Sequence, residues 1–119
     1  MASKPFTKIT NVFSPGKAMI IKWVGLANGD DGLPFKWQPY RGKSVHILGT
    51  FGAGGTVVLE GSNADDVASY VTLNDPQGNP ISVSSEKIEE VLENVYAVRP
   101  RVIAGDGTTD IDVFLLVTR

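Results

Sequence analysis

Apolar side chains recur at every second position along most of this chain, and this period of two restricts its fold more than any other feature. Successive side chains of a β-strand point to opposite faces, so the period is typical of strands with one buried face. Clusters of Gly, Pro, Asn and Asp separate the runs, as turns require. Six strands are expected, at residues 18–26, 44–51, 56–61, 69–73, 95–103 and 110–118. Two weaker strands are expected at residues 36–38 and 81–83.

The two strands of the C-terminal third predict a β-hairpin. A type II′ turn at residues 105–106 would place Arg101 opposite Asp110. The same register places Arg99 opposite Asp112, and opposite charges stabilise such a ladder. A type I′ turn one residue later stays open as an alternative, because it keeps the same charges on one face. The other face is expected to be core, with Tyr96, Val98, Val102, Ile111, Val113, Leu115 and Val117.

One short helix is expected after the strand at residues 81–83. Ser85 can cap it, and Glu86 lies in its first turn. Apolar residues follow at helical spacing, at Ile88, Val91, Leu92 and Val95. The glutamates of this segment would face water, because they lack the histidine partners and the enclosure of a metal site.

About eight strands, one short helix and no βαβ alternation predict an all-β protein, an antiparallel β-sandwich with a jelly-roll-like arrangement. A chain of 119 residues fits one such domain. We therefore expect the β-sandwich domain to cover residues 15–119. Residues 1–14 are expected to stand apart as an N-terminal arm, since Pro5 and Pro15-Gly16 bracket a mixed segment of Lys, Thr and Phe.

Composition excludes several classes of protein. The pI of about 5.3 argues against a nucleic-acid-binding protein, whose surface is usually basic. No apolar run approaches the roughly 18 residues that span a bilayer, and the first residues lack the apolar core of a secretory signal. The chain has no Cys, which excludes disulfides and thiolate metal sites. These observations predict synthesis in a cytoplasm and binding to neither nucleic acid nor membrane.

The charged residues are divided unevenly along the chain. Residues 1–52 hold seven basic and two acidic side chains, whereas residues 53–119 hold four basic and eleven acidic ones. Two interpretations stay open. The charges intermingle on one folded surface, or a basic N-terminal segment lies on an acidic neighbour in an assembly, where complementary fields set orientation.

No set of residues predicts catalysis. His46 is the one histidine, and it falls inside an expected strand without a nucleophile turn nearby. The glycine-rich run at residues 49–55 lacks the Lys and the helix start of a phosphate loop, so a strand connection is expected there. Asp pairs at residues 30–31 and 65–66 could hold calcium but match no EF-hand spacing. We therefore expect no enzyme activity, no cofactor and no metal.

Three short motifs resemble the head decoration, or cement, proteins of tailed bacteriophages. The motifs are Glu60–Asn63, Arg99–Val102 and Gly105–Thr108, within a similarity that covers about residues 44–119. The chain departs from the family pattern at Asp65-Asp66 and Tyr70, where Asp-Gly and Trp are expected. All these are turn and strand positions, so they identify a fold better than an activity.

The resemblance implies a structural virion protein that decorates the capsid exterior and stabilises it by bridging neighbouring capsid subunits. Its partners would be the major capsid protein and further copies of itself, as a homotrimer. The expected interface residues of the arm are Lys4, Phe6, Lys8 and Phe13. Those of the long loop are Phe35, Trp37, Tyr40 and Arg41.

A carbohydrate-binding β-sandwich module of a phage tail or host-recognition fibre is the alternative. The Glu-Gly-Ser-Asn run, followed by an acidic loop, also resembles discoidin-like sugar-binding sandwiches. Trp37 and Tyr40 would then stack on sugar rings, since an aromatic side chain offers a large apolar surface with a polar tip.

Overall fold

The period of two is realised as β-strands in the computed structural model, which describes residues 2–10, 17–36, 41–64 and 69–119. The first six strands are β1 (Ser3–Lys4), β2 (Phe6–Ile9), β3 (Ala18–Leu26), β4 (Asp31–Gly32), β5 (Phe35–Lys36) and β6 (Gly42–Thr50). The others are β7 (Thr56–Ser62), β8 (Val71–Thr72), β9 (Ser82–Val83), β10 (Lys87–Glu90), β11 (Ala97–Ala104) and β12 (Asp110–Thr118). Over the described ranges there is no helix that is long and apolar enough to cross a bilayer.

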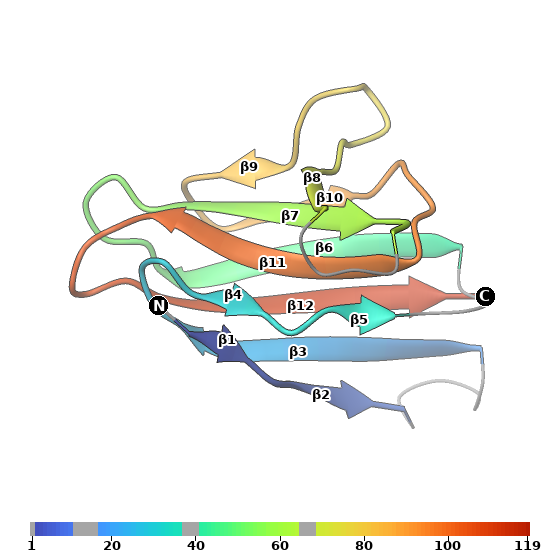
Figure 1. The fold of residues 1–119 in the computed structure, drawn as a ribbon, viewed down its shortest axis with the longest axis horizontal. Helices are drawn as coiled ribbons and strands as arrows, with labels where there is room; N and C mark the ends of the chain where they lie inside the picture. Colours follow the sequence, from blue (N-terminus) through green and yellow to red (C-terminus); the bar gives the residue numbers. More distant parts are fainter. Residues whose placement is uncertain (1, 11–16, 37–40, 65–68) are drawn as a thin grey trace.

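The strands form two sheets that pack face to face (Figure 1). Sheet B has five strands in the order β10-β6-β12-β3-β2, all antiparallel. Sheet A has seven strands, with the main order β1-β4-β11-β7-β8; β5 also pairs with β11, and β9 with β7. Its described pairs are antiparallel except for β1 with β4. The predicted all-β, two-sheet architecture is confirmed, although the short strands raise the number above the expected eight.

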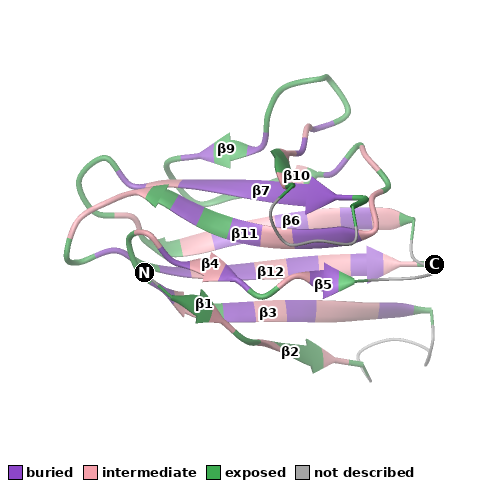
Figure 2. Ribbon diagram, viewed as in Figure 1, coloured by how far each residue is buried: buried purple, intermediate pink, exposed green. Residues whose placement is uncertain are grey.

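The core lies between the sheets, on the faces that the alternation predicted. Buried and less buried positions alternate along β12 and along the middle of β3 (Figure 2). The inward residues of β11 and β12 join one apolar cluster with those of β3, β6 and β7. Each such side chain contributes about 1.5 to 3 kcal/mol on burial. Six of the seven predicted core residues of the C-terminal third are buried: Val98, Val102, Ile111, Val113, Leu115 and Val117. Tyr96 is half-buried.

The predicted helix after Ser85 is wrong, because this segment continues the sheet as β10. Ile88 pairs with His46 of β6, in antiparallel register along the whole of β10. Val91 is buried, but Ile88 and Leu92 are 64% and 53% exposed. These residues therefore do not share the single buried face that the predicted helix requires. Pairing with the open edge of β6 supplies backbone hydrogen bonds that outweigh the weak local helix preference.

The predicted C-terminal hairpin is also wrong, because β11 and β12 lie in different sheets. β11 pairs with β7, whereas β12 pairs with β3 and β6. Both strands have one apolar face, and opposite sheets allow these faces to meet across the core. Arg99 and Arg101 therefore lie beside Glu60 of β7 instead of Asp112 and Asp110. Carboxylates on either β7 or β12 could pair with these two arginines. Charge alone therefore could not decide which strand pairs with β11.

The N-terminal segment does not stand apart as an arm over its described residues, 2–10. β1 pairs with β4 of sheet A, and β2 pairs with β3 of sheet B. The segment therefore crosses from one sheet to the other at one margin of the sandwich (Figure 1). Asp30 fixes its start, since Oδ1 accepts a hydrogen bond from Ala2 N and Oδ2 one from Ala27 N, both at 2.9 Å. The expectation of a free arm is wrong because β3 offers an open edge and Asp30 offers acceptors.

Trp23 is the largest fully buried side chain, and it links β3 to the N-terminal segment and to the loop after β4. Phe6 packs edge-on against it, with 5.8 Å between ring centroids. Its Nε1 donates to the carbonyl oxygen of Leu33 at 3.0 Å. A β-carbon at Gly32 would lie 2.4 Å from the indole ring, so this position requires glycine.

Replacing Asp30 with Ala should reduce the free energy of unfolding by about 1 to 3 kcal/mol, because two amides lose a charged acceptor. Urea-induced unfolding monitored by tryptophan fluorescence measures this change. Asp110→Ala, at an exposed position of β12, is the matched control and should change stability by less than about 0.5 kcal/mol. Equal losses in both variants would contradict the anchoring role of Asp30.

Candidate interaction surface

The outer face of sheet B carries a set of apolar side chains among polar ones, although water-facing sheet faces usually carry polar side chains. Its apolar residues come from β3, β6, β10 and β12 and are here called the apolar face: Ile20, Val24, Leu48, Ile88, Phe114 and Leu116. Val24 is 55% exposed and Ile88 64%, while the others are half-buried. Exposed apolar side chains gathered on one face mark a protein contact more often than single exposed ones.

Polar residues on the same face surround Phe114. Its backbone partners are His46 on β6 and Lys22 on β3. The His46 and Phe114 rings meet edge-on with centroids 6.3 Å apart, and Lys22 Nζ lies 5.4 Å from the Phe114 centroid. His46 Nε2 is 3.0 Å from Glu86 Oε2. His46 is therefore a half-buried surface residue whose ring contacts an aromatic and a carboxylate.

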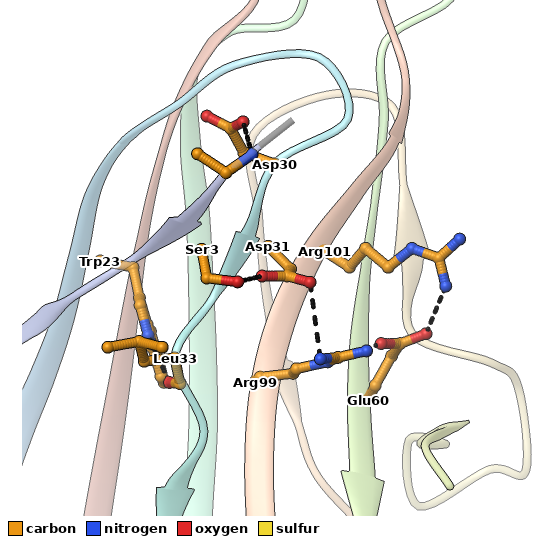
Figure 3. Close-up of polar contacts among 9 residues, drawn as sticks. Ser3, Trp23, Asp30, Asp31, Leu33, Glu60, Arg99 and Arg101 are labelled. Carbon is orange, nitrogen blue, oxygen red and sulfur yellow. Dashed lines mark hydrogen bonds and ion pairs between the residues drawn. The ribbon is translucent and has the colours of Figure 1, made fainter. Parts of the chain in front are cut away.

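The outer face of sheet A has the opposite character, because charged side chains neutralise one another there (Figure 3). Arg99 Nε donates to Glu60 Oε1 at 3.1 Å, and Arg101 Nη1 to Glu60 Oε2 at 3.3 Å. A second nitrogen of Arg99 lies 3.5 Å from Asp31 Oδ2, and Ser3 Oγ donates to Asp31 Oδ1 at 2.6 Å. These charged side chains are therefore paired with one another, with Glu60 buried and Arg101 exposed.

The Glu60–Asn63 motif builds this fold instead of a binding site. Glu60 holds the two arginines, and a β-carbon at Gly61 would lie 2.6 Å from the Val95 side chain. Ser62 Oγ accepts from Ala64 N at 3.0 Å, and Asn63 Oδ1 accepts from Tyr96 N at 2.8 Å. Every residue of the motif therefore has a structural contact.

The Gly105–Thr108 motif lies in the connection between β11 of sheet A and β12 of sheet B. Asp106 accepts hydrogen bonds from the Thr108 hydroxyl and from the amides of Ala53 and Thr108, at 2.6 to 2.8 Å. These donors lower the pKa of Asp106 to about 2, with the Thr108 hydroxyl contributing most. The contact with Ala53 joins this connection to the glycine-rich turn between β6 and β7. That turn is a strand connection here.

The predicted interface residues are only partly brought together. Phe6, Lys8 and Phe35 gather at the margin of β2 and β5, where Lys8 Nζ lies 5.8 Å from the Phe35 centroid and Phe6 packs edge-on against Phe35. Phe35 is buried, so it serves the core. Lys4 lies 3.9 Å from Asp30. Arg41 is exposed beside the end of β12, while Phe13, Trp37 and Tyr40 lie outside the described residues.

A surface cleft of about 340 Å³ opens beside β7 and β8. Its lining combines hydroxyl, amide and carboxylate groups with apolar side chains: Gly61, Ser62, Asn63, Ala64, Ser69, Val71, Thr72, Leu73, Asn74, Glu93 and Val95. Glu93 accepts from the backbone and side-chain amides of Asn74 at 2.8 and 2.7 Å. Partial burial opposes the charged form of Glu93, but these hydrogen bonds outweigh it and lower its pKa.

The Asp pair at residues 30–31 acts within the fold. Asp30 accepts from two backbone amides, and Asp31 contacts Ser3 and Arg99. Among the residues that the structure describes, no group of three or more His, Asp or Glu side chains is arranged to hold a metal ion. The pair at residues 65–66 lies outside the described ranges.

The apolar face was not recognised from the sequence, although a signal for it exists. Residues 18–26 carry apolar side chains at both parities, and so do residues 44–51 and 110–118. Such strands are expected to be covered on both sides. The structure covers one side only, so the second apolar side is left open to solvent.

Two packed sheets define this protein as a β-sandwich. Comparison with protein families finds no match, and comparison with curated proteins finds none. Among solved structures, the SPBc2 prophage-derived protein YomS is similar, with a TM-score of 0.63 and 12% sequence identity. The match covers 90% of this chain and 99% of that one. At this identity the likeness shows a shared fold.

Lys43 generates a prediction of pH dependence. Its side chain is buried on the inner side of β6, where Nζ donates to Asn94 Oδ1 at 2.9 Å. Burial lowers the pKa of Lys43 from 10.5 to about 8, although Glu93 acts in the opposite direction. Between these two values the unfolded chain binds more protons than the folded one, so folding stability should rise with pH.

Urea unfolding at several pH values from about 8 to 10.5 measures this rise. Lys43→Met should remove it, because no proton is then released on folding. Lys17→Met, at an exposed position, is the matched control and should keep the rise. An unchanged slope in Lys43→Met would show that other groups cause the pH dependence.

Proposed function

We propose that this protein is a structural, non-enzymatic component of a bacteriophage virion that decorates the capsid exterior and stabilises the capsid. The apolar face is the observation that carries this proposal. It would contact the major capsid protein across neighbouring subunits, while the paired charges of sheet A face solvent. Further copies of the chain would be the second partner, as a homotrimer.

Three findings support the proposal. The fold is shared with a prophage-derived protein, YomS, over nearly the whole of both chains. The motifs that resemble decoration proteins, Glu60–Asn63 and Gly105–Thr108, form contacts that maintain this fold. The apolar face provides contact area on the described residues of sheet B. Burial there would contribute roughly 25 cal/mol per Å², reduced by the costs of association.

The stabilisation would come from bridging and not from the free arm that the sequence predicted. Residues 2–10 are committed to the two sheets of their own domain. A docked N-terminal segment makes the sandwich stiffer, so less ordering entropy is lost when the apolar face meets a capsid. Phe6 therefore contributes to the shape of its own domain, through its packing against Trp23 and Phe35.

Binding to capsids tests the proposal. Heads of the phage that encodes this chain, assembled without it, are titrated with purified protein and sedimented through sucrose. Val24→Asp places a charge on the apolar face and should weaken binding by about tenfold or more, because the carboxylate is buried on contact. Wild-type protein should also raise the temperature at which the heads open.

The matched control is Ile103→Asp. Ile103 is 48% exposed on β11 of sheet A, close to the 55% of Val24, so the two substitutions are alike in chemistry and exposure. Ile103→Asp should bind heads as the wild type does. Equal binding by all three proteins, or no binding by the wild type, would refute the proposal.

The cleft beside β8 supports a second candidate function, carbohydrate binding. Hydroxyl and amide groups together with apolar side chains suit a polyhydroxylated ring. Saturation-transfer NMR with simple sugars tests this candidate. Val71→Arg, at a cleft-lining residue that is 70% exposed, should abolish binding, while Leu92→Arg, at an exposed residue outside the lining, should not. Absence of transfer to every sugar would remove the candidate.

A further inference from the structure

We propose that copies of this chain associate head to tail, with strand β2 of one copy pairing with strand β10 of the next to extend sheet B. This inference identifies the strands through which copies of the chain would contact one another. It rests on the proposed function in one respect, the assumption that the protein associates with itself. It follows from the open edges of sheet B, their charges and their strand directions.

The two margins of sheet B are both open strands. β2 (Phe6–Ile9) ends the sheet on one side and β10 (Lys87–Glu90) on the other, and each has four residues (Figure 1). In the described part of the chain, no further strand pairs with their outer sides. An open strand presents unpaired N–H and C=O groups and accepts another strand readily.

The charges of these two strands are opposite. β2 carries Lys8, which is exposed, and Lys4 and Lys36 lie on the short strands β1 and β5 of the same margin. β10 carries Glu89 and Glu90, with Glu86 directly before it and Lys87 as its only cation. A basic margin and an acidic margin therefore occupy opposite sides of one sheet. We call them the β2 margin and the β10 margin.

This distribution selects the mode of association. A two-fold axis perpendicular to the sheet would pair β2 with β2, or β10 with β10, and bring like charges together. A head-to-tail contact pairs opposite charges instead. Repetition of one such contact closes a ring when the rotation permits, and a homotrimer is one such ring.

The directions of β2 and β10, and the side of sheet B on which their charged side chains lie, are consistent with this contact. Neighbouring strands of sheet B alternate in direction, so β2 and β10, four strands apart, run the same way. The extended sheet would therefore have a parallel pair at each junction. Lys8 lies opposite Ile21, and Glu89 opposite Val45; both of these partners are buried, so Lys8 and Glu89 lie on the inner side of sheet B.

A register with Lys8 opposite Glu89 fits the remaining side chains. Glu89 already has an ion pair with Lys87 at 3.2 Å, and Lys8 of the next copy would add a second cation to it. Thr7 would then lie opposite Ile88 on the outer side, with Ile9 diagonally next to it. Ile88 is 64% exposed in the single chain, and this contact would cover it. Cross-strand pairs of this kind are the unit of sheet stabilisation.

Charge reversal tests the proposal on the free, full-length protein without capsids. Sedimentation equilibrium over a range of concentrations measures association at low and high salt. Wild-type protein should associate, and more weakly at high salt. Lys8→Glu and Glu89→Lys should each weaken association by about tenfold or more, because each creates like charges at the junction. The double variant should restore association.

Four outcomes would overturn the proposal. They are a monomeric wild type at all concentrations, association unaffected by either single reversal, a folded double variant that stays monomeric, and loss of association in Val24→Asp. The last would place the self-contact on the apolar face instead. Circular dichroism and urea unfolding identify any variant that fails to fold, and Thr7→Val with Ile88→Val then tests the same junction without a charge change. Since capsid binding is measured separately, the β2–β10 contact can fail while the proposed binding to the capsid stands.

Discussion

The structure depends on burying one apolar face of each long strand against the opposite sheet. β11 and β12 are adjacent in the chain and each has such a face, yet they lie in different sheets and meet across the core. A hairpin would have left both faces on the same side and required another layer to cover them. The connection after β11 therefore crosses between the sheets, and Asp106 is the residue that fixes its shape.

The sequence predicted the strands and their buried faces because these depend on local alternation. It did not predict which strands pair. Arg99 finds a carboxylate at Glu60 as readily as it would at Asp112, so pairing by charge has more than one solution. The segment after Ser85 has both a helical and a strand pattern, and the open edge of β6 decided between them. Such choices are made by tertiary contacts that are distant in the chain.

The candidate interaction surface was harder to predict than the core. Apolar residues at both parities of β3 and β12 indicate strands with two apolar faces, but not which face lacks a cover. The expected interface residues are aromatic or basic and lie in segments that the sequence predicts to be free. Phe35 proved to be core, and Phe6 packs on Trp23, because an apolar side chain near an incomplete core is drawn into it.

The contact between Trp23 and Gly32 has a consequence for the evolution of this fold. The indole ring occupies the volume that any β-carbon at Gly32 would need, so the two positions are constrained together although they lie in different sheets. Pro100 adds to this constraint, because its Cδ would lie 2.7 Å from the same β-carbon. A side chain at position 32 becomes tolerable only when both the tryptophan and the proline are replaced or move. Related sandwiches should therefore exchange these three residues together, and the set can serve as a marker of descent where overall identity is low.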